Sequence, residues 1–422
     1  MGNQKVIIAG AGATGLTTAL ALAQAGCRVT VIGKSVAPPP TRTVALWGAS
    51  VRLLDNIGIW QSARAFAEPL LAMRILDATG SLFKLPPVEF RAAELGLPGF
   101  GFNISNADLV AVLLASVKAD KRITLHDSLV RKITPQPPFI TVESDDATIH
   151  EAALLVGAEG SQSPSRQATG IKQRQWQYPQ VAVTAVLQHR CPHHHVSTEF
   201  HTRSGPCTLV PMLSLPDAPY RSGLVWLMAP PEAARRTALS HSDFATELEA
   251  MTQSVLGALT IEGQLGSFPM RGMSVERFGQ NRTMLVGEAA HAFPPIGAQG
   301  LNLGLRDVAA LAEIVSSANA SAQDCGSDAM TQNYHRSRNS DVALRTAGVD
   351  VLNRSLLAPY LPVDFLRGAG LMALASIAPL RRAVMRVGLA PQALPPLMRA
   401  PQGPAKAFDR RDAAQNHQTA RR

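Results

Sequence analysis

The sequence predicts an α/β fold, in which a parallel sheet carries an inserted antiparallel β-rich lobe and is followed by C-terminal helices. Three observations lead to this prediction. The chain opens with a strand, a glycine-rich turn and a helix; alternating segments dominate from about residue 177 to 228; and a strand at Thr283–Val286 with a long helix after Gly300 restores the first pattern. With 422 residues, 46% of them apolar, the chain can bury a sizeable core in two or three domains.

The first unit lies at the N-terminal end. The apolar run Lys5–Ala9 is typical of a buried strand, and the Ala/Leu-rich run Leu16–Ala25 is typical of a helix. Gly26 stands where a helix C-cap is expected, and Arg28–Ile32 alternates as a second strand. A strand, a tight turn, a helix and a second strand form the repeating unit of a parallel sheet.

Shorter elements follow along the chain. A loop is expected around Pro38-Pro39-Pro40, and a helical stretch is predicted from Ala45 to about Ala67. The other predicted elements are a helix at Leu109–Val117, short strands at Ile123–Leu125, Ile140–Val142 and Leu154–Gly157, and antiparallel strands at Val181–Val186 and Gly223–Leu227. The last twenty residues are polar and are predicted to be disordered.

Composition argues against several classes of protein. The four cysteines, Cys27, Cys191, Cys207 and Cys325, form no C-x-x-C pair, which argues against a disulfide scaffold or a zinc site and fits a reducing cytoplasm. The first apolar run leads directly into the glycine-rich turn, so no signal peptide is expected. No apolar stretch reaches the roughly 20 residues of a spanning helix. We therefore expect a cytoplasmic protein that is soluble or peripheral to the inner membrane.

Basic charge is concentrated at the C-terminal end. The formal net charge is +9, and residues 351–422 hold eleven Lys and Arg against three Asp. No nucleic-acid-binding motif accompanies this charge, so no nucleic-acid partner is expected. Short apolar pieces separated by prolines precede the basic tail. They predict either contact with an anionic membrane surface or helices packed on the rest of the protein with a solvated tail.

The turn Gly10-Ala11-Gly12-Ala13-Thr14-Gly15 has the G-x-G-x-x-G spacing of a dinucleotide-binding turn. Its first glycine permits the tight turn, its second lets backbone approach a pyrophosphate, and its third lets the helix pack on the strand. The start of the helix then offers free N–H groups to the phosphates. An acid that binds the ribose is expected after the second strand, but Gly33 and then Lys34 stand there, so ribose binding is expected to be weaker or supplied elsewhere.

Two later segments carry further chemistry. In Arg282–Gly304 a strand ends at Gly287, Glu288 follows, the rigid Pro294-Pro295-Ile296-Gly297 segment turns the chain, and glycines open a helix. In Leu154–Arg166 a strand is followed by Glu159-Gly160 and then by Ser163-x-x-Arg166.

These segments resemble the FAD fingerprints of the class A flavoprotein monooxygenases, the p-hydroxybenzoate-hydroxylase-like family, whose Rossmann-like FAD-binding domain is of the glutathione-reductase type. The resemblance implies that Glu288 binds the ribityl and pyrophosphate region and that the Pro-Pro-x-Gly loop lies along the isoalloxazine ring. The following helix would face the pyrimidine edge, where its dipole stabilises negative charge on the reduced flavin. Glu159-Gly160 and Arg166 stand where the family contacts the pyrophosphate and a pyridine nucleotide. Glu288 and Glu159 replace the family's Asp, which implies a slightly altered cofactor geometry.

Within this family, Arg42-Thr43-Val44-Ala45-Leu46 resembles the Arg-x-x-Ala-Leu signature of the ubiquinone-biosynthesis hydroxylases of the UbiH/UbiF/VisC type. The resemblance implies an FAD-dependent monooxygenase that hydroxylates the aromatic ring of a polyprenylated phenol or quinone precursor through a flavin C4a-hydroperoxide. It also implies O2 as co-substrate, NAD(P)H or another electron donor, and other ubiquinone-biosynthesis proteins as partners. Arg42, Pro295 and Gly297 are predicted to lie at the reacting groups. The predicted cofactor contacts are Gly10, Gly12, Ala13, Thr14, Gly15, Gly33, Lys34, Arg42, Glu159, Gly160, Gly287, Glu288, Pro295, Gly297, Gly300, Leu301 and Asn302.

The predicted domains are a discontinuous FAD-binding domain (1–75, 100–175 and 265–345), a substrate domain (76–99 and 176–264), a helical segment (346–400) and a basic tail (401–422). Trp176, Tyr178 and Trp226 are predicted to wall the substrate pocket. No metal site is expected, because the run His193-His194-His195 has no further ligand at metal spacing in the sequence. Two alternatives stay open: a flavin-dependent reductase or dehydrogenase of a prenyl lipid, and a non-catalytic FAD-binding component of a ubiquinone-synthesis assembly.

Overall fold

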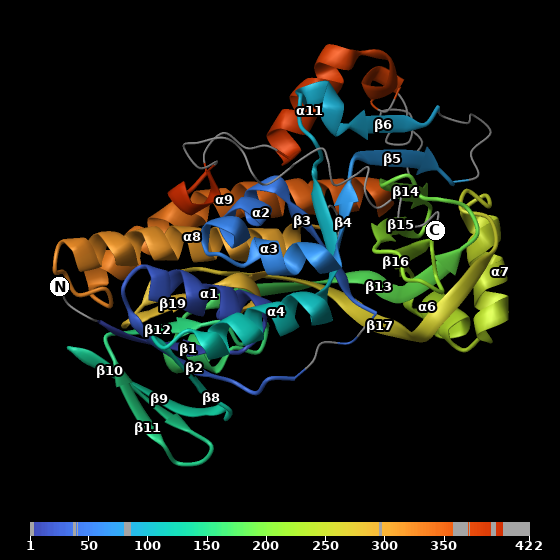
Figure 1. Cartoon of the computed structure of the whole chain (residues 1–422). Coiled ribbons are helices and arrows are strands. Elements are labelled where there is room, and N and C mark those ends of the chain that lie inside the picture. The colour runs from blue at the N-terminus through green and yellow to red at the C-terminus, as the bar shows by residue number, and fades with distance from the viewer. Residues whose placement is uncertain are drawn as a thin grey trace.

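A computed structural model describes residues 4–36, 39, 41–79, 86–294, 298–357, 370, 372–389 and 394–399. Its strands form four sheets, one of six strands, one of eight and two of three (Figure 1). The six-stranded sheet carries the glycine-rich turn, and the eight-stranded sheet forms the core of the opposite lobe.

The six-stranded sheet is mostly parallel and has the order β18-β19-β12-β1-β2-β8. In its centre, Val6 lies opposite Leu154 on one side and Val29 on the other, and β18 pairs with β19 in the antiparallel sense. The strands are β1 (Lys5–Ala9), β2 (Arg28–Ile32), β8 (Ile123–His126), β12 (Leu154–Gly157), β18 (Gly279–Gln280) and β19 (Thr283–Leu285). This confirms the strands predicted at these positions, whose near-continuous apolar character suits burial on both faces.

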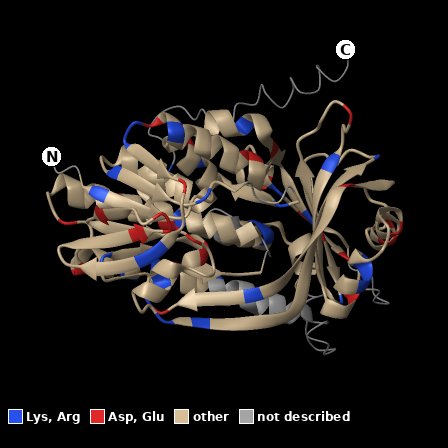
Figure 2. Cartoon of the chain, turned by 90° about the horizontal axis from the view of Figure 1, so that it is seen from below, with Lys and Arg blue, Asp and Glu red and all other residues tan. Residues whose placement is uncertain are grey.

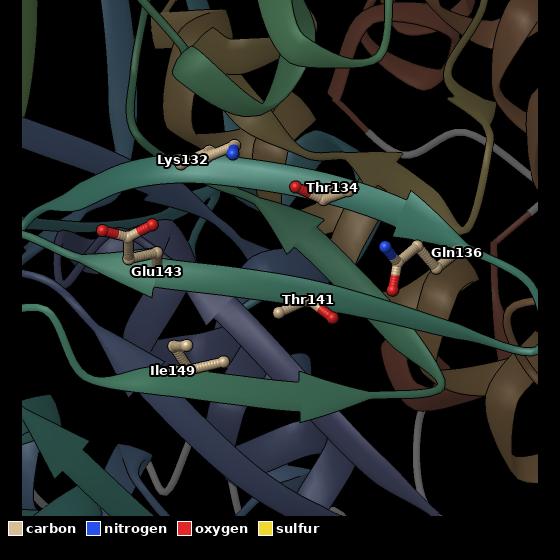
Figure 3. Close-up of a pocket in the computed structure, with 6 residues that line it drawn as sticks. All are labelled: Lys132, Thr134, Gln136, Thr141, Glu143 and Ile149. Atoms are coloured by element: carbon tan, nitrogen blue, oxygen red, sulfur yellow. The ribbon is translucent and has the colours of Figure 1, made fainter.

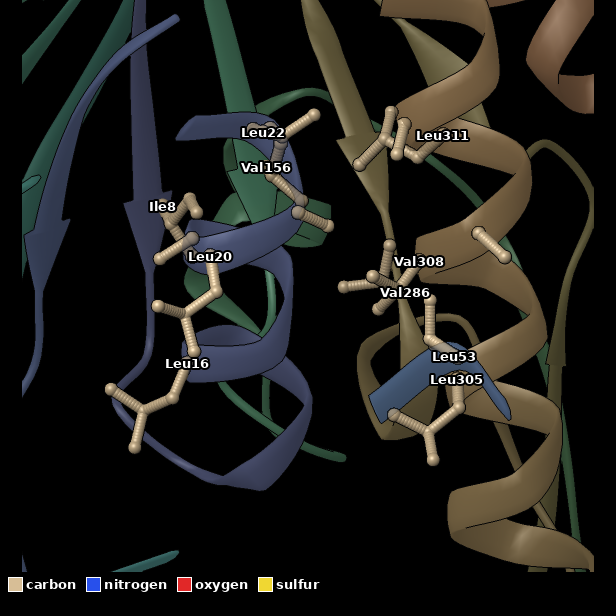
Figure 4. Close-up of a cluster of buried hydrophobic side chains, with 14 of the residues drawn as sticks. Ile8, Leu16, Leu20, Leu22, Leu53, Val156, Val286, Leu305, Val308 and Leu311 are labelled. Atoms are coloured by element: carbon tan, nitrogen blue, oxygen red, sulfur yellow. The ribbon is translucent and has the colours of Figure 1, made fainter. Parts of the chain in front are cut away.

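Helices cover one face of this sheet. Ile8 and Val156 of the sheet pack with Leu16 of α1 and Leu311 of α8 in one cluster (Figure 4). The helices on this side are α1 (Ala13–Gln24), α4 (Asn106–Ala119) and α8 (Gln299–Ala320), each at or near a predicted helix. Gly26 follows α1 with a φ of +89°, as expected for a glycine that ends a helix.

A three-stranded antiparallel sheet, β11-β10-β9, covers the other face. Its strands are β9 (Val130–Gln136), β10 (Phe139–Ser144) and β11 (Ile149–Ala152). Ile140 and Val142 of β10 pack against Ile7 and Leu155 of the parallel sheet. Because side chains alternate along a strand, Ile7 faces this layer while Ile8 faces the helices.

The eight-stranded sheet has the order β20-β17-β13-β16-β15-β14-β5-β6. Its strands are β5 (Ala72–Asp77), β6 (Val88–Arg91), β13 (Gln173–His189), β14 (Val196–Thr202), β15 (Gly205–Met212), β16 (Arg221–Met228), β17 (Leu259–Val275) and β20 (His291–Ala292). The long strands β13 and β17 run from one lobe into the other (Figure 1). Helices α6 (Pro230–Thr237) and α7 (His241–Met251) cover one face of the sheet.

A small sheet, β3-β7-β4, corrects the helix predicted from Ala45 to Ala67. That stretch begins as strand β3 (Thr43–Trp47), and only then forms α2 (Gly48–Asn56), α3 (Trp60–Ala63) and the 3-10 turn η1 (Arg64–Phe66). The partners of β3 are β4 (Ala67–Leu70) and β7 (Gly101–Ser105). Val44 lies opposite Ile104, and this pairing of two β-branched residues favours a strand over a helix.

The C-terminal elements are α9 (Asp328–Leu357), α11 (Ala378–Leu389) and η5 (Pro396–Met398). Within the described ranges, no helix is both long and apolar enough to cross a membrane. Acidic and basic residues are interspersed over the described part of the chain (Figure 2). The predicted disordered tail, 401–422, lies outside the described residues.

Candidate active site

The glycine-rich turn joins β1 to α1 at the carboxyl end of the parallel strands. A Cβ atom added to Gly10, whose φ is +109°, would collide with the carbonyl group of Ala158, and one added to Gly15 would collide with the carbonyl oxygen of Gly10. These two glycines therefore permit close packing of the turn on β12 and of the helix on the turn. A Cβ added to Gly12 meets no atom of the described residues within 4 Å, so among them this position is open to a ligand.

The start of α1 is free of side-chain caps. Gly12 is its N-cap residue, and its first turn contains no acid that would occupy the amide groups. These orphan N–H groups are suited to bind an anion. The side chain of Thr14 instead lies against two later glycines, since Cβ atoms added to Gly287 and Gly304 would lie 3.0 and 3.3 Å from its hydroxyl oxygen. Thr14 thus holds the first nucleotide segment against the second.

Gly33, at the end of β2, has a packing role. A Cβ atom added there would lie 2.5 Å from the amide nitrogen of Ala11 and 3.0 Å from its Cβ. A longer side chain at position 33 would therefore displace the glycine-rich turn. An acid could not stand at position 33 without this displacement, and Lys34 follows with an exposed side chain.

Glu159 is bound by its own loop. Its carboxylate accepts hydrogen bonds from the hydroxyl of Ser163 at 2.8 Å, the amide of Ser165 at 3.1 Å and the hydroxyl of Ser165. Burial raises the pKa of this carboxyl, against the lowering effect of the serine hydrogen bonds. The Glu159 side chain therefore stabilises the start of the short helix α5 (Pro164–Ala168). In the Glu159-Gly160 pair, it is Gly160, with a φ of +79°, that leaves space for a ligand.

Arg166 is likewise used internally. It is 1% exposed and donates to the carbonyl oxygens of Ala289 at 2.8 Å and Ser161 at 2.7 Å. The contact of Arg166 with a pyridine nucleotide that the resemblance implied is therefore not supported. The guanidinium instead ties the Glu159 loop to the loop after β19.

The second nucleotide segment places an open acid beside the first. After β19 the chain turns at Gly287, with a φ of +60°, and the exposed Glu288 follows. Glu288 makes no ion pair with a described residue, and its Oε2 lies 4.0 Å from a Cβ atom placed on Gly160. Glu288 is thus directed to the gap between the two loops. Pro295 and Gly297, both predicted site residues, lie outside the described residues.

Helix α8 begins after Ala298, which has a left-handed φ of +53° and supplies no side-chain cap. A Cβ added to Gly300 meets no described residue within 4 Å, and Leu301 next to it is half-buried. Asn302 is different, because its amide is fully used. Its Oδ1 accepts from the Trp47 amide at 2.9 Å and the Ser50 hydroxyl at 2.7 Å, while its Nδ2 donates to the carbonyls of Ala45 and Ala298. The side chain of Asn302 therefore clamps α8 to β3 and cannot also bind a cofactor.

A buried charge network that the sequence analysis missed supports this loop. Asp307 is fully buried and accepts from the Gly287 amide at 2.9 Å, from Nε of Arg338 at 2.7 Å and pairs with Nε2 of His291 at 2.6 Å. Burial alone would raise the pKa of Asp307, but the opposite charges of His291 and Arg338 bring it below its ordinary value. The signal in the sequence was an acid in an otherwise apolar stretch of α8. Its partner Arg338 on α9 could not be identified without the fold.

Arg42 lies where the lobe of the eight-stranded sheet begins. Its exposed guanidinium stacks over the ring of Phe268 in β17, with Cζ 4.6 Å from the ring centroid. Tyr178 and Phe268 pack against one small apolar cluster of the eight-stranded sheet. The indole of Trp176 donates to the Tyr178 hydroxyl at 2.7 Å. Trp226 packs with Phe244 of α7 on the opposite face of the sheet. Its predicted place in the wall of the substrate pocket is therefore wrong.

A shallow hollow on the β9–β11 sheet is a separate feature (Figure 3). Its lining residues alternate along β9 and β10 and stand on the face opposite the one packed on the parallel sheet; they are Lys132, Thr134, Gln136, Thr141, Glu143 and Ile149. The residues of the nucleotide segments are not among them, so we do not assign the hollow to the active site.

These arrangements fit an FAD molecule. Two uncapped helices, α1 and α8, start beside each other, because Gly304 near the start of α8 lies against Thr14 near the start of α1. Among the described residues nothing fills the space beside Gly12 and Gly300, and Glu288, which pairs with none of them, follows Gly287, which lies against Thr14. Helix starts suit the pyrophosphate and the electron-rich edge of the flavin, and a carboxylate suits hydroxyl donors.

Comparisons with known proteins agree with this site. A family model described as "FAD binding domain" matches residues 3–345. Ubiquinone hydroxylase UbiL of Rhodospirillum rubrum is 31% identical over 388 residues, covering 90% of this chain and 88% of that protein. The 3-demethoxyubiquinol 3-hydroxylase of Escherichia coli is 29% identical, covering 92% of this chain and all of that protein.

Solved structures show the same fold. The p-nitrophenol 4-monooxygenase PnpA of Pseudomonas putida has a TM-score of 0.76 at 18% identity, covering 93% of this chain and 99% of that one. HpxO from Klebsiella pneumoniae, complexed with FAD and uric acid, has a TM-score of 0.70 at 19% identity, covering 88% of this chain and 93% of that one.

Proposed function

Because the chain belongs to the FAD-binding family identified by these matches, we propose that it is an FAD-dependent monooxygenase of ubiquinone biosynthesis. Its substrate in this proposal is a polyprenylated phenol or quinone precursor, which it hydroxylates on the aromatic ring. The observation that carries the proposal is that the uncapped starts of α1 and α8 lie together with Glu288, which pairs with no charged group among the described residues. The names of the relatives support the substrate class.

Bound FAD would supply the redox and oxygen-activating chemistry, with O2 as co-substrate and NAD(P)H or another donor as the source of electrons. The amides after Gly12 would hold the pyrophosphate, and Glu288 would accept hydrogen bonds from hydroxyl groups of the cofactor. The amides after Ala298, with Gly300 and Leu301, would stabilise negative charge at the ring. The division into an FAD-binding domain and an inserted substrate domain is part of this proposal.

Arg42 would act at the substrate side. The flat face of the Arg42 guanidinium lies over the Phe268 ring. The N–H groups at the edge of the guanidinium therefore remain available to bind a phosphate or polarise a substrate oxygen. The neighbouring apolar surface of Phe268 and Tyr178 would exclude water from the ring being hydroxylated.

A membrane-facing role for α11 also belongs to the proposal. Met385 and Arg381 face inward, the latter 2.8 Å from Glu94, whereas Ile377, Leu380 and Val384 are 41–48% exposed. Arg382 and Arg386 are exposed on the same helix. An apolar stripe with basic residues beside it suits an anionic membrane, where a polyprenylated substrate resides.

Liposome flotation tests the membrane contact. The wild-type protein should float with anionic vesicles and detach at high salt, and a Leu380→Glu/Val384→Glu variant should stay in solution with its flavin bound. Equal flotation of both proteins, or none by the wild type, would show that α11 only packs on the protein.

The catalytic proposal is tested by product analysis with ¹⁸O2. Deletion of the gene should cause a ubiquinone precursor to accumulate, and the purified, reduced enzyme should convert that precursor to a product that carries one labelled oxygen. A reduced or desaturated product without label would indicate a prenyl-lipid reductase or dehydrogenase. Protein that holds FAD but cannot be reduced and reoxidised by any donor would indicate a non-catalytic component.

A further inference from the structure

Three metal-ligating side chains converge where β4 meets the turn between β13 and β14. One carboxylate oxygen of Glu68 and one ring nitrogen each of His193 and His195 lie within 4.8 Å of one another. Glu68 is separated from His195 by 127 residues, and its Oε1 lies 2.6 Å from the histidine Nδ1. The histidine run that had no third ligand in the sequence therefore acquires one through the fold.

The backbone holds this arrangement in place. His194 and His195 adopt left-handed φ values of +51° and +58°, which turn the chain so that the rings of His193 and His195 lie 5.7 Å apart. The amide of Leu71, at the end of β4, donates to the carbonyl of His195 at 3.0 Å. The turn is thus already docked on β4, and its ligands need little reorganisation to bind an ion.

His193 is prepared to act as a ligand. Its Nδ1 accepts a hydrogen bond from the His195 amide at 3.1 Å. Its Nε2 is buried and has no hydrogen-bond partner among the described residues. A buried polar atom without a partner is unusual in a native protein and indicates a missing ligand or solvent molecule.

We propose that Glu68, His193 and His195 bind a divalent transition-metal ion of the zinc class. Two imidazoles and one carboxylate suit zinc, cobalt or nickel, whereas magnesium and calcium prefer oxygen ligands alone. Water would complete the tetrahedral set. The ring of His189 lies edge-on to that of His193, but its two ring nitrogens lie 2.8 Å from the Cys191 carbonyl and 3.0 Å from the Ser222 hydroxyl, so it is not the fourth ligand.

Binding requires two local changes. The ion takes the place of the hydrogen bond between Glu68 and Nδ1 of His195, so that the ring proton of His195 must lie on Nε2. An ion on Nε2 of His193 places the ring proton on Nδ1, and the 3.1 Å contact from the His195 amide to that atom is given up. In return, the ion fastens the β13–β14 turn of the eight-stranded sheet to β4 of the small sheet.

Zinc titration of the flavin-loaded, chelator-treated protein against a chromophoric competitor tests the proposal. All measurements use a Cys191→Ser background, because the Cys191 thiol is exposed and can bind zinc by itself. One equivalent of zinc is expected, with a higher melting temperature, and cobalt should give the visible absorption of a tetrahedral site. Glu68→Gln, His193→Ala and His195→Ala should each weaken binding by at least about tenfold.

His194→Ala is the matched control, since His194 belongs to the same run but is exposed and is not part of the cluster. It should bind zinc as the unmodified protein does, and the flavin spectrum of every variant reports that the fold is intact. Absence of zinc binding by the wild-type cluster would show that Glu68 and His195 form an ion pair only. Binding that survives all three ligand substitutions, or that is lost in His194→Ala, would equally overturn the proposal.

Discussion

Substitution of Gly12 and of Gly15 by valine should have opposite consequences, although the two glycines lie three residues apart in one turn. At Gly12 the backbone is extended, with φ −80° and ψ 178°, and an added Cβ meets none of the structurally described residues within 4 Å. Gly12→Val should therefore change the stability of the apoprotein by less than about 1 kcal/mol. At Gly15 the added Cβ collides with the carbonyl oxygen of Gly10. Overpacking at this position should cost at least about 1–3 kcal/mol.

Cofactor affinity should show the reverse order for the folded proteins. The valine at position 12 would occupy the space in front of the orphan amides of α1. Loss of two charge-assisted hydrogen bonds of about 1.5–3 kcal/mol each corresponds to roughly a 10²- to 10⁴-fold loss of FAD affinity. Denaturant unfolding of the apoproteins and fluorescence titration with FAD measure the two effects separately. Full FAD affinity in Gly12→Val, or an apoprotein as unstable as Gly15→Val, would refute the assignment of this turn.

Gly33→Ala should lower the unfolding free energy by about 1–3 kcal/mol and Gly33→Glu should lower FAD affinity, both measured on purified protein; tighter FAD binding by Gly33→Glu would contradict the packing role. Asp307→Asn leaves the buried Arg338 with Asp341 as its remaining countercharge and should cost about 1.5–3 kcal/mol in denaturant unfolding, whereas Glu232→Gln on the surface of α6 should cost less than about 1 kcal/mol. Because the folded-state pKa of Asp307 is lowered, its contribution is complete above about pH 4 and is lost as the pH falls through the folded value. Thermal melts should therefore show a smaller loss of stability below about pH 4 in Asp307→Asn than in the wild type.

The sequence predicted elements well where local pattern and tertiary environment agree. Strand β1, helix α1 and strand β2 have the period of their final structures and flank a turn whose glycines have no alternative role. The predicted helix wrongly included residues 45–47, the last three of β3, because so short an apolar run has no decisive period, and its conformation depends on pairing with β7, more than fifty residues later. Pairing with a distant strand, and not the local sequence, therefore determines the conformation of β3.

The candidate site was predictable to the extent that backbone chemistry defines it. The glycine spacing identified Gly12 and the start of α1, because few other roles require glycine at those intervals. The polar residues were harder to interpret. Arg166, Asn302 and Asp307 stand in or beside nucleotide segments, yet each is buried and bonded to protein groups. A sequence motif does not show in which direction a side chain points. A residue that shapes a loop and a residue that contacts the ligand therefore cannot be distinguished from the motif alone.

The two acids that replace the family's aspartates therefore have different consequences. Glu159 is held by Ser163 and Ser165, so Glu159→Asp should loosen its loop and lower stability while FAD affinity changes little. Glu288 has no partner among the described residues and is directed toward Gly160, so Glu288→Asp should move a carboxylate that, in the proposed function, binds the cofactor. Loss of one charge-assisted hydrogen bond of about 1.5–3 kcal/mol would lower FAD affinity roughly ten- to a hundredfold. Titration of both variants with FAD, together with their unfolding midpoints, distinguishes the two roles. If Glu159→Asp loses the cofactor and Glu288→Asp keeps it unchanged, the loop would bind FAD through Glu159, and the internal hydrogen bonds of that carboxylate would have to break when the cofactor enters.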